Sequence, residues 1–203
     1  HDNQFPLKVW QTGSGTQTNM NLNEVISNLA SLEIGKPLGS HNPIHPNDHV
    51  NQSQSTNDTF PAAIQIATVQ QIKENLLPEI DLLIESLNKK SREWSGIIKI
   101  GRTHLQDAVP LTLGQEVSAW SDQIKAAYNR IETSLIELYP LPLGGTAIGT
   151  GLNAPQDYDK EIAKEVAQLF NLPFTSADNK FAIMASHDGL VNTMSQLKLL
   201  AVA

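Results

Sequence analysis

The chain has 203 residues, a formal net charge of −7, 40% hydrophobic and 17% charged residues, and no cysteine. This length can bury a substantial core, and the negative charge without any Lys/Arg-rich run argues against a nucleic-acid partner. The lack of cysteine excludes disulfides, thiolate nucleophiles and cysteine-ligated metal, and no apolar run approaches the roughly 20 residues that a membrane span needs.

The N-terminal region is expected to hold one helix. It should begin within residues 19–23 and end at Gly35, which is followed by Lys36-Pro37 and gives a strong stop signal. Helical spacing predicts a buried face formed by Val25, Leu29 and Leu32.

Residues 39–58 form a long polar segment without helical or strand periodicity. A structureless segment of this length is usually functional or disordered, and disorder normally brings charge. Here only Asp48 and Asp58 are ionised, among many His, Asn, Gln and Ser side chains. We therefore expect an ordered loop that faces a ligand.

Two long helical patterns follow. The first runs from Asp58 to about Trp94, with a kink expected at Pro78 because proline cannot donate the helical hydrogen bond. The second covers residues 113–138, where apolar residues recur at steps of three and four throughout. That regular spacing is typical of a helix in a bundle seam.

The segments around these helices are expected to be short. Residues 97–100 should be a linker, and residues 101–107 a polar turn between helices. Further helices are expected over residues 153–171 and from residues 176–178 to the end of the chain.

These elements predict an all-α fold, a bundle of long helices preceded by a loop-rich helical N-terminal region. Residues 1–54 should belong to an N-terminal domain and residues 55–203 to the helical-bundle domain. Helices this long usually pack against other subunits. Because the sequence starts at His1 and stops inside an apolar helical pattern, we expect it to be a piece of a longer polypeptide.

Four polar clusters lie where a loop is expected to pass into a helix. They are Ser14-Gly15-Thr16, His45-Pro46-Asn47-Asp48, Ser55-Thr56-Asn57 and Thr103-His104. Free backbone N–H groups and the positive end of the helix dipole collect at such junctions, so anions are favoured there. A small dicarboxylate would suit this set of neutral donors. Arg102 is the only cation near the clusters, so we expect a second cation from elsewhere.

Each cluster also has a simpler interpretation. Ser55-Thr56-Asn57 can cap a helix, and Ser14-Gly15-Thr16 can be a plain turn. His45 and His49 have the i, i+4 spacing of metal ligands, but Pro46 between them and the lack of an H-E-x-x-H pattern count against metal. The glycines of residues 144–151 lack dinucleotide-binding spacing and are interpreted as a tight turn.

Together the clusters resemble the fumarase/aspartase superfamily, most closely its class II fumarases. The resemblance rests on four stretches in the family's order, which are Val9–Asn21, His45–Asp58, Gly101–Ala108 and Gly144–Asn153. It covers essentially the whole chain. Gly15-Thr16-Gln17-Thr18-Asn19 and His104 favour fumarase over aspartase.

The resemblance implies a hydro-lyase that adds water reversibly to fumarate, giving L-malate, in the tricarboxylic acid cycle. It implies that His104 donates or accepts the proton, directly or through a water. By matched position, substrate carboxylates would be bound by Ser14, Gly15, Thr16, Ser55, Thr56, Asn57 and Thr103. A second, non-catalytic anion site would comprise His45, Pro46, Asn47 and Asp48. No cofactor or metal is implied.

The resemblance also implies a homotetramer whose active sites draw on several subunits, located in the cytoplasm, or in the mitochondrion of a eukaryote. The family's later loop, with a catalytic Ser and a substrate-binding Lys and Asn, has no counterpart in these 203 residues. The missing Lys is the cation that the charge argument requires. Two alternatives stay open: an aspartase-like ammonia-lyase, and a catalytically incomplete helical oligomerisation fragment.

Overall fold

The structure, a computed structural model, describes residues 1–203. Contacts divide the chain into two compact units. The loop-rich unit comprises residues 1–67 and 139–187, and the bundle unit comprises residues 68–138 and 188–203. These residue sets differ from the expected domains 1–54 and 55–203, whose boundary within a longer protein stays a prediction.

The loop-rich unit contains four helical segments joined by loops. They are α1 (Thr16–Glu33), the start of α2 (Thr56–Gln71), α5 (Tyr158–Phe170) and α6 (Lys180–Ala185). A 3-10 turn covers Asp2–Gln4 and a π-helical turn covers Pro46–Val50. Strands β3 (Pro140–Leu141) and β4 (Thr175–Ser176) pair in parallel. The remainder is loop, held by the polar contacts described below.

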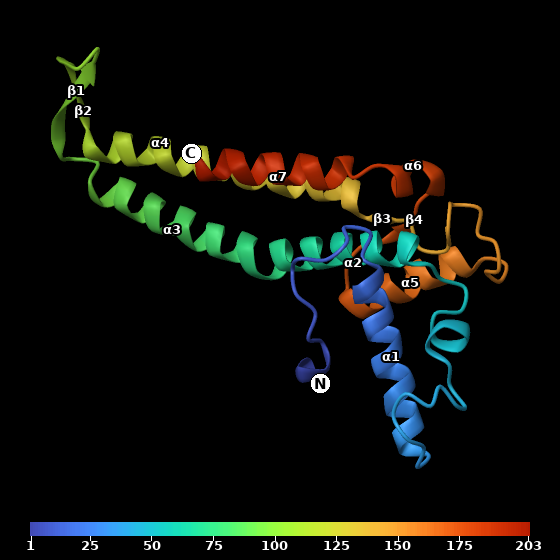
Figure 1. Cartoon of the computed structure of the whole chain (residues 1–203). Coiled ribbons are helices and arrows are strands. Elements are labelled where there is room, and N and C mark those ends of the chain that lie inside the picture. Colours follow the sequence, from blue (N-terminus) through green and yellow to red (C-terminus); the bar gives the residue numbers. More distant parts are fainter. The chain divides into compact units, whose positions relative to one another are not determined.

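The bundle unit contains the longest helix of the chain, which covers Leu113–Ser134. After the end of α2 and a π-helical turn at Ile72–Leu76 come α3 (Leu77–Glu93), α4 (Leu113–Ser134), a 3-10 turn (Leu135–Leu138) and α7 (Asp188–Ala201). In Figure 1, α3 and α4 lie side by side and α7 runs along α4. The fully buried side chains of this unit include Val69, Val117, Ile131, Leu135 and Leu138. The all-α prediction is therefore confirmed.

The prediction of a linker and a polar turn at residues 97–107 was wrong, because this segment belongs to a β-hairpin. Strands β1 (Ile98–Thr103) and β2 (Gln106–Thr112) form an antiparallel hairpin between α3 and α4, with a register irregularity between Ile100 and Arg102. β-Branched residues at alternate positions favour strand, and Ile98 and Ile100 carry that signal. The hairpin leads into α4 through a capping box, in which the Thr112 hydroxyl accepts from the Gln115 amide N–H at 3.1 Å.

The buried face of α1 was also predicted wrongly. Leu32 is exposed, whereas Asn23, Ser27 and Ser31 are buried. The Ser27 hydroxyl donates to the Ile44 carbonyl, because the polar segment that follows α1 lies against this face. Small hydroxyl side chains allow a loop backbone to approach closely while satisfying its carbonyls, which hydrophobic periodicity cannot reveal.

Three helix boundaries differ from expectation. α1 begins at Thr16 and α5 at Tyr158, and the single last helix is two helices, α6 and α7. Ser186, between them, has extended backbone. A serine favours a helix end because its hydroxyl competes for the backbone, and Asp188 in the first turn favours a new helix N-terminus.

Candidate functional site

The first polar cluster lies at the N-terminal end of α1. Gly15 is the residue before the helix, and its φ of 78° is left-handed. A Cβ at Gly15 would lie 2.2 Å from the Phe60 ring, so the position requires glycine. The Ser14 hydroxyl lies 3.3 Å from that of Thr12 and 3.4 Å from that of Thr16. The turn thus presents three hydroxyls beside the free N–H groups of the first helical turn.

Side-chain amides connect α1 to the start of α2. The Asn19 Nδ2 donates to the Thr56 hydroxyl at 3.0 Å and to the Asn51 Oδ1 at 3.2 Å. Asn23 donates to the same Asn51 oxygen at 3.2 Å. These contacts hold the Thr16 end of α1 close to the Ser55 end of α2. Sequence reasoning did not single out Asn19 or Asn51 as site residues, because one asparagine in a helix or in a turn gives no signal by itself.

The cluster at residues 55–57 does cap α2. The Ser55 Oγ accepts from the Asn57 amide N–H at 3.2 Å, and the Ser55 N–H donates to Asp58 at 2.9 Å. A hydroxyl that accepts from a backbone amide still has its own O–H to donate. Likewise Thr56 accepts from Asn19, so its hydroxyl proton remains available. Capping and ligand binding are therefore compatible here.

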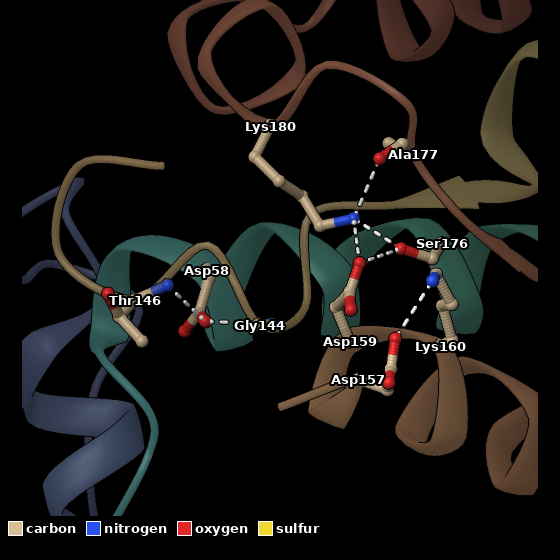
Figure 2. Close-up of polar contacts among 9 residues, drawn as sticks. All are labelled: Asp58, Gly144, Thr146, Asp157, Asp159, Lys160, Ser176, Ala177 and Lys180. Atoms are coloured by element: carbon tan, nitrogen blue, oxygen red, sulfur yellow. Dashed lines mark hydrogen bonds and ion pairs between the residues drawn. The ribbon is translucent and has the colours of Figure 1, made fainter. Parts of the chain in front are cut away.

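The glycine-rich loop, residues 144–151, lies against this end of α2. The Asp58 Oδ2 accepts from the Thr146 amide at 2.8 Å and from the Gly144 amide at 3.1 Å (Figure 2). The Asn57 Nδ2 donates to the Ala147 carbonyl at 2.7 Å. Asp58 is fully buried, and burial raises the pKa of its carboxyl, while hydrogen bonds from the Ser55, Thr146 and Gly144 amides partly offset that rise.

A cavity of about 890 Å³ opens between these elements within the loop-rich unit. Its walls come from α1, from residues 47–56 and from the glycine-rich loop with the residues that follow it. The lining residues from the predicted clusters are Thr16, Asn47, Asp48, Ser55 and Thr56. Thr146, Ala147 and Asn153 also line it, and the tight-turn interpretation of the glycines did not anticipate that. No Lys or Arg lines the cavity.

The histidine cluster forms a capped turn. The His45 Nδ1 accepts from the Asn47 and Asp48 amides at 3.2 and 3.1 Å, and the His49 Nδ1 accepts from the His45 amide at 2.8 Å. His45 Nδ1 also lies 3.5 Å from the Asp48 carboxylate, but a nitrogen that accepts two N–H bonds is unprotonated. No group of three His, Cys, Asp or Glu side chains in the chain could hold a metal ion.

Thr103 and His104 belong to the bundle unit, whereas all the residues that line the cavity belong to the loop-rich unit. They lie at the tip of the hairpin, where Thr103 pairs with Gln106. His104 and Leu105 form the two-residue loop, with φ of 50° and 63°. Both values are left-handed, as a type I′ turn requires. Arg102 lies 3.5 Å from the Asp107 carboxylate across the hairpin.

A partly buried ionic cluster around Lys180 borders the other side of the glycine-rich loop. The Lys180 Nζ donates to the Ala177 carbonyl at 2.7 Å and to the Ser176 hydroxyl, and lies 3.3 Å from the Asp159 carboxylate (Figure 2). Ser176 donates to Asp159 at 2.6 Å. This hydrogen bond, followed by Lys180, lowers the pKa of the Asp159 carboxyl.

Comparison with known proteins covers the whole chain. A family model described as lyase matches residues 1–203. Fumarate hydratases class II from two strains of Prochlorococcus marinus are 74% and 71% identical over 100% of this chain, which spans 44% of each relative. The crystal structure of recombinant class II fumarase from Schistosoma mansoni matches with a TM-score of 0.95 at 43% identity, over 100% of this chain and 45% of that one. The chain thus spans less than half the length of these relatives. None of its helices is long and apolar enough to cross a membrane.

Proposed function

We propose, from the premise that this chain belongs to the lyase family, that the protein containing it hydrates fumarate reversibly to L-malate as a class II fumarate hydratase. The observation that carries the proposal is the cavity of the loop-rich unit, walled by hydroxyls and amides at the N-terminal ends of α1 and α2. Two helix N-termini and neutral donors suit a small dicarboxylate. The relatives named class II fumarate hydratase support the same substrate.

The donors at the N-terminal ends of α1 and α2 divide into two carboxylate-binding groups, of which Thr16, Ser55 and Thr56 line the cavity. Ser14, Gly15 and Thr16 offer hydroxyls and first-turn N–H groups at α1. Ser55, Thr56 and Asn57 offer the corresponding groups at α2, with the hydroxyl protons of Ser55 and Thr56 still free to donate. We assign substrate carboxylate binding to both groups, and to Thr103.

In the direction from L-malate to fumarate, the chemistry requires removal of a proton from the L-malate carbon beside a carboxylate. The carboxylate then becomes a doubly charged aci-carboxylate, and the hydroxyl on the neighbouring carbon leaves as water after protonation. Preorganised N–H and O–H donors favour that extra negative charge over the ground state. We assign proton transfer to His104, because imidazole changes charge near neutral pH. His45, Pro46, Asn47 and Asp48 are assigned to the second, non-catalytic anion site.

The cavity needs more than this chain supplies. Its ionised lining group is Asp48, and Arg102 is paired with Asp107 on the hairpin. A dianion bound by neutral donors alone is weakly held, so a cation from outside these residues is required. We propose that it comes from the part of the longer protein beyond this segment, and that a homotetramer completes shared active sites. We further propose a role in the tricarboxylic acid cycle, in the cytoplasm or in a mitochondrion.

An absorbance assay on the complete gene product tests the proposal, with loss of the ultraviolet absorbance of fumarate's conjugated double bond as the readout. Conversion of fumarate to L-malate without any added cofactor is the expected result. Release of ammonium from L-aspartate, with no hydration of fumarate, would instead identify an ammonia-lyase. Helical association without either turnover would identify an oligomerisation fragment.

A further inference from the structure

We propose that Asp58 is a positioning residue, whose carboxylate fastens the glycine-rich loop to the N-terminal end of α2 and thereby sets the shape of the dicarboxylate cavity. This inference rests on the proposed function, since it concerns how the same cavity recognises its substrate. Asp58 is fully buried and does not line the cavity itself. It acts through the residues that it holds.

The two oxygens of Asp58 have different partners. Oδ1 accepts from the Ser55 amide at 2.9 Å, within the cluster assigned to carboxylate binding. Oδ2 accepts from the Gly144 and Thr146 amides at 3.1 and 2.8 Å. One carboxylate therefore joins the two walls of the cavity, the α2 end and the loop, through three backbone N–H groups. Only a group with two acceptor oxygens can do this without placing a donor against an N–H.

The loop has little freedom to compensate for a lost contact. Gly144 has a φ of 84°, and a Cβ there would lie 2.4 Å from the Asp159 Cβ. Thr146 has a φ of 54°, which is left-handed and unfavourable for a β-branched residue. Strained backbone of this kind persists only where its surroundings hold it. The contacts of Asp58 supply that restraint on one side, and Asp159 borders the loop on the other.

The restraint matters because the loop forms a wall. Thr146 and Ala147 line the cavity together with Ser55 and Thr56. The Asn57 side chain donates to the Ala147 carbonyl at 2.7 Å, so a displaced loop would also release an amide assigned to substrate binding. A shift at Thr146 would therefore disturb two residues of the α2 group, Ser55 through Asp58 and Asn57 through Ala147.

Asp58→Asn in the complete gene product is the test, because it keeps the shape and removes one acceptor. Whichever way the amide is turned, its NH₂ faces a backbone N–H, of Ser55 or of the loop. We expect the KM for fumarate to rise about 10- to 100-fold, the effect of losing a hydrogen bond to a charged group, with a much smaller fall in kcat. Amide exchange followed by mass spectrometry should become faster in the peptide containing residues 144–151.

Asp157→Asn is the matched control. Asp157 is an exposed aspartate paired with Lys160 at 2.8 Å (Figure 2), and its left-handed φ of 59° is well tolerated by asparagine. It should change neither KM nor loop exchange. Faster loop exchange in Asp58→Asn with an unchanged KM overturns the positioning role, and so does unchanged loop exchange. A wild-type protein inactive on fumarate would instead refute the proposed function.

A measurement without substitution covers the case in which Asp58→Asn does not fold. Saturating L-malate should slow amide exchange of residues 144–151 in the wild-type protein, because the loop then packs against bound substrate. Exchange that is unchanged by L-malate, in a protein that turns over fumarate, overturns the proposal.

Discussion

Asn51 accepts hydrogen bonds from two turns of α1 at once, since its Oδ1 lies 3.2 Å from the Nδ2 of Asn19 and 3.2 Å from that of Asn23. Asn19 also reaches Thr56 at 3.0 Å. Asn19 of α1 thus ties together the two helix N-termini that we propose to bind the two carboxylates.

Replacing Asn19 by alanine should destabilise the protein by about 1–2 kcal/mol, because the Asn51 and Thr56 partners lose a donor in a partly buried site. It should also raise the KM for fumarate, since the ends of α1 and α2 are no longer tied. Chemical denaturation and initial-rate kinetics measure the two effects. Glu24→Ala, at an exposed position of α1, is the control and should leave KM unchanged. A normal KM in Asn19→Ala would contradict the role of this link.

His104→Asn should lower kcat about 10²- to 10⁴-fold in the complete gene product, the range expected for loss of a proton-transfer group. Binding of L-malate, measured by calorimetry, should change much less because the carboxylate donors remain. His187→Asn, an exposed histidine between α6 and α7, is the matched control. Turnover of His104→Asn within about threefold of wild type would refute the assignment.

Leu105→Gly should stabilise the hairpin. Leu105 is 95% exposed with a φ of 63°, so it loses no packing and is relieved of a left-handed strain of roughly 1–2 kcal/mol, partly offset by the greater freedom of glycine when unfolded. We expect slower amide exchange across β1 and β2. Leu38→Gly, exposed at a φ that is not positive, should instead lower the melting temperature.

Lys180→Met should lower the free energy of unfolding by about 2 kcal/mol, because the partly buried Asp159 and Ser176 side chains lose the buried cation that they contact. The side chain of Lys180 is only 10% exposed, whereas that of Lys160, paired with Asp157, is 71% exposed. Lys160→Met is therefore the control and should scarcely alter the melting temperature, since exposed ion pairs contribute little. Equal effects of the two variants would show that burial of Lys180 adds nothing.

The pH dependence of stability should have opposite signs for two aspartates. The pKa of Asp159 is lowered, so its stabilising contribution is present above the unfolded pKa of about 4 and is lost as pH falls through the folded pKa. The pKa of Asp58 is raised, so its ionisation costs stability as pH rises from about 4 through the folded pKa. Unfolding free energies of Asp159→Asn and of Asp58→Asn, each compared with wild type from about pH 3 to about pH 7, measure both trends. If the two differences in unfolding free energy from wild type changed with pH in the same direction, the opposite signs expected for Asp159 and Asp58 would be contradicted.

The long helices were predictable because their apolar residues recur at helical spacing over many turns. Residues 113–138 are an example, since Val117, Ile131 and Leu138 are buried as the spacing predicts. The clusters at residues 14–16, 45–48 and 55–57 were predictable as junctions between a loop and a helical segment for a similar local reason, whereas Thr103-His104 lies at the tip of a hairpin and not before a helix. The hairpin was missed because its tip carries a His-Leu pair rather than the usual Asn-Gly.

The buried face of α1 and the partners of Asp58 could not be predicted from local sequence patterns. Ser27 and Asp58 are polar residues whose burial depends on a loop backbone that packs against them. Thr146, which donates to Asp58, is 88 residues away in sequence. No local pattern encodes such a pairing.

The sequence by itself determined the helical class, the position of the long helices and the residue types suited to an anion. The tertiary structure decided which of these residues share a cavity, because backbone N–H and carbonyl groups of the glycine-rich loop had to be satisfied by Asp58 and Asn57. Hydrogen-bond satisfaction in a buried site is a property of three-dimensional neighbours, whereas helix periodicity is a property of neighbours in sequence.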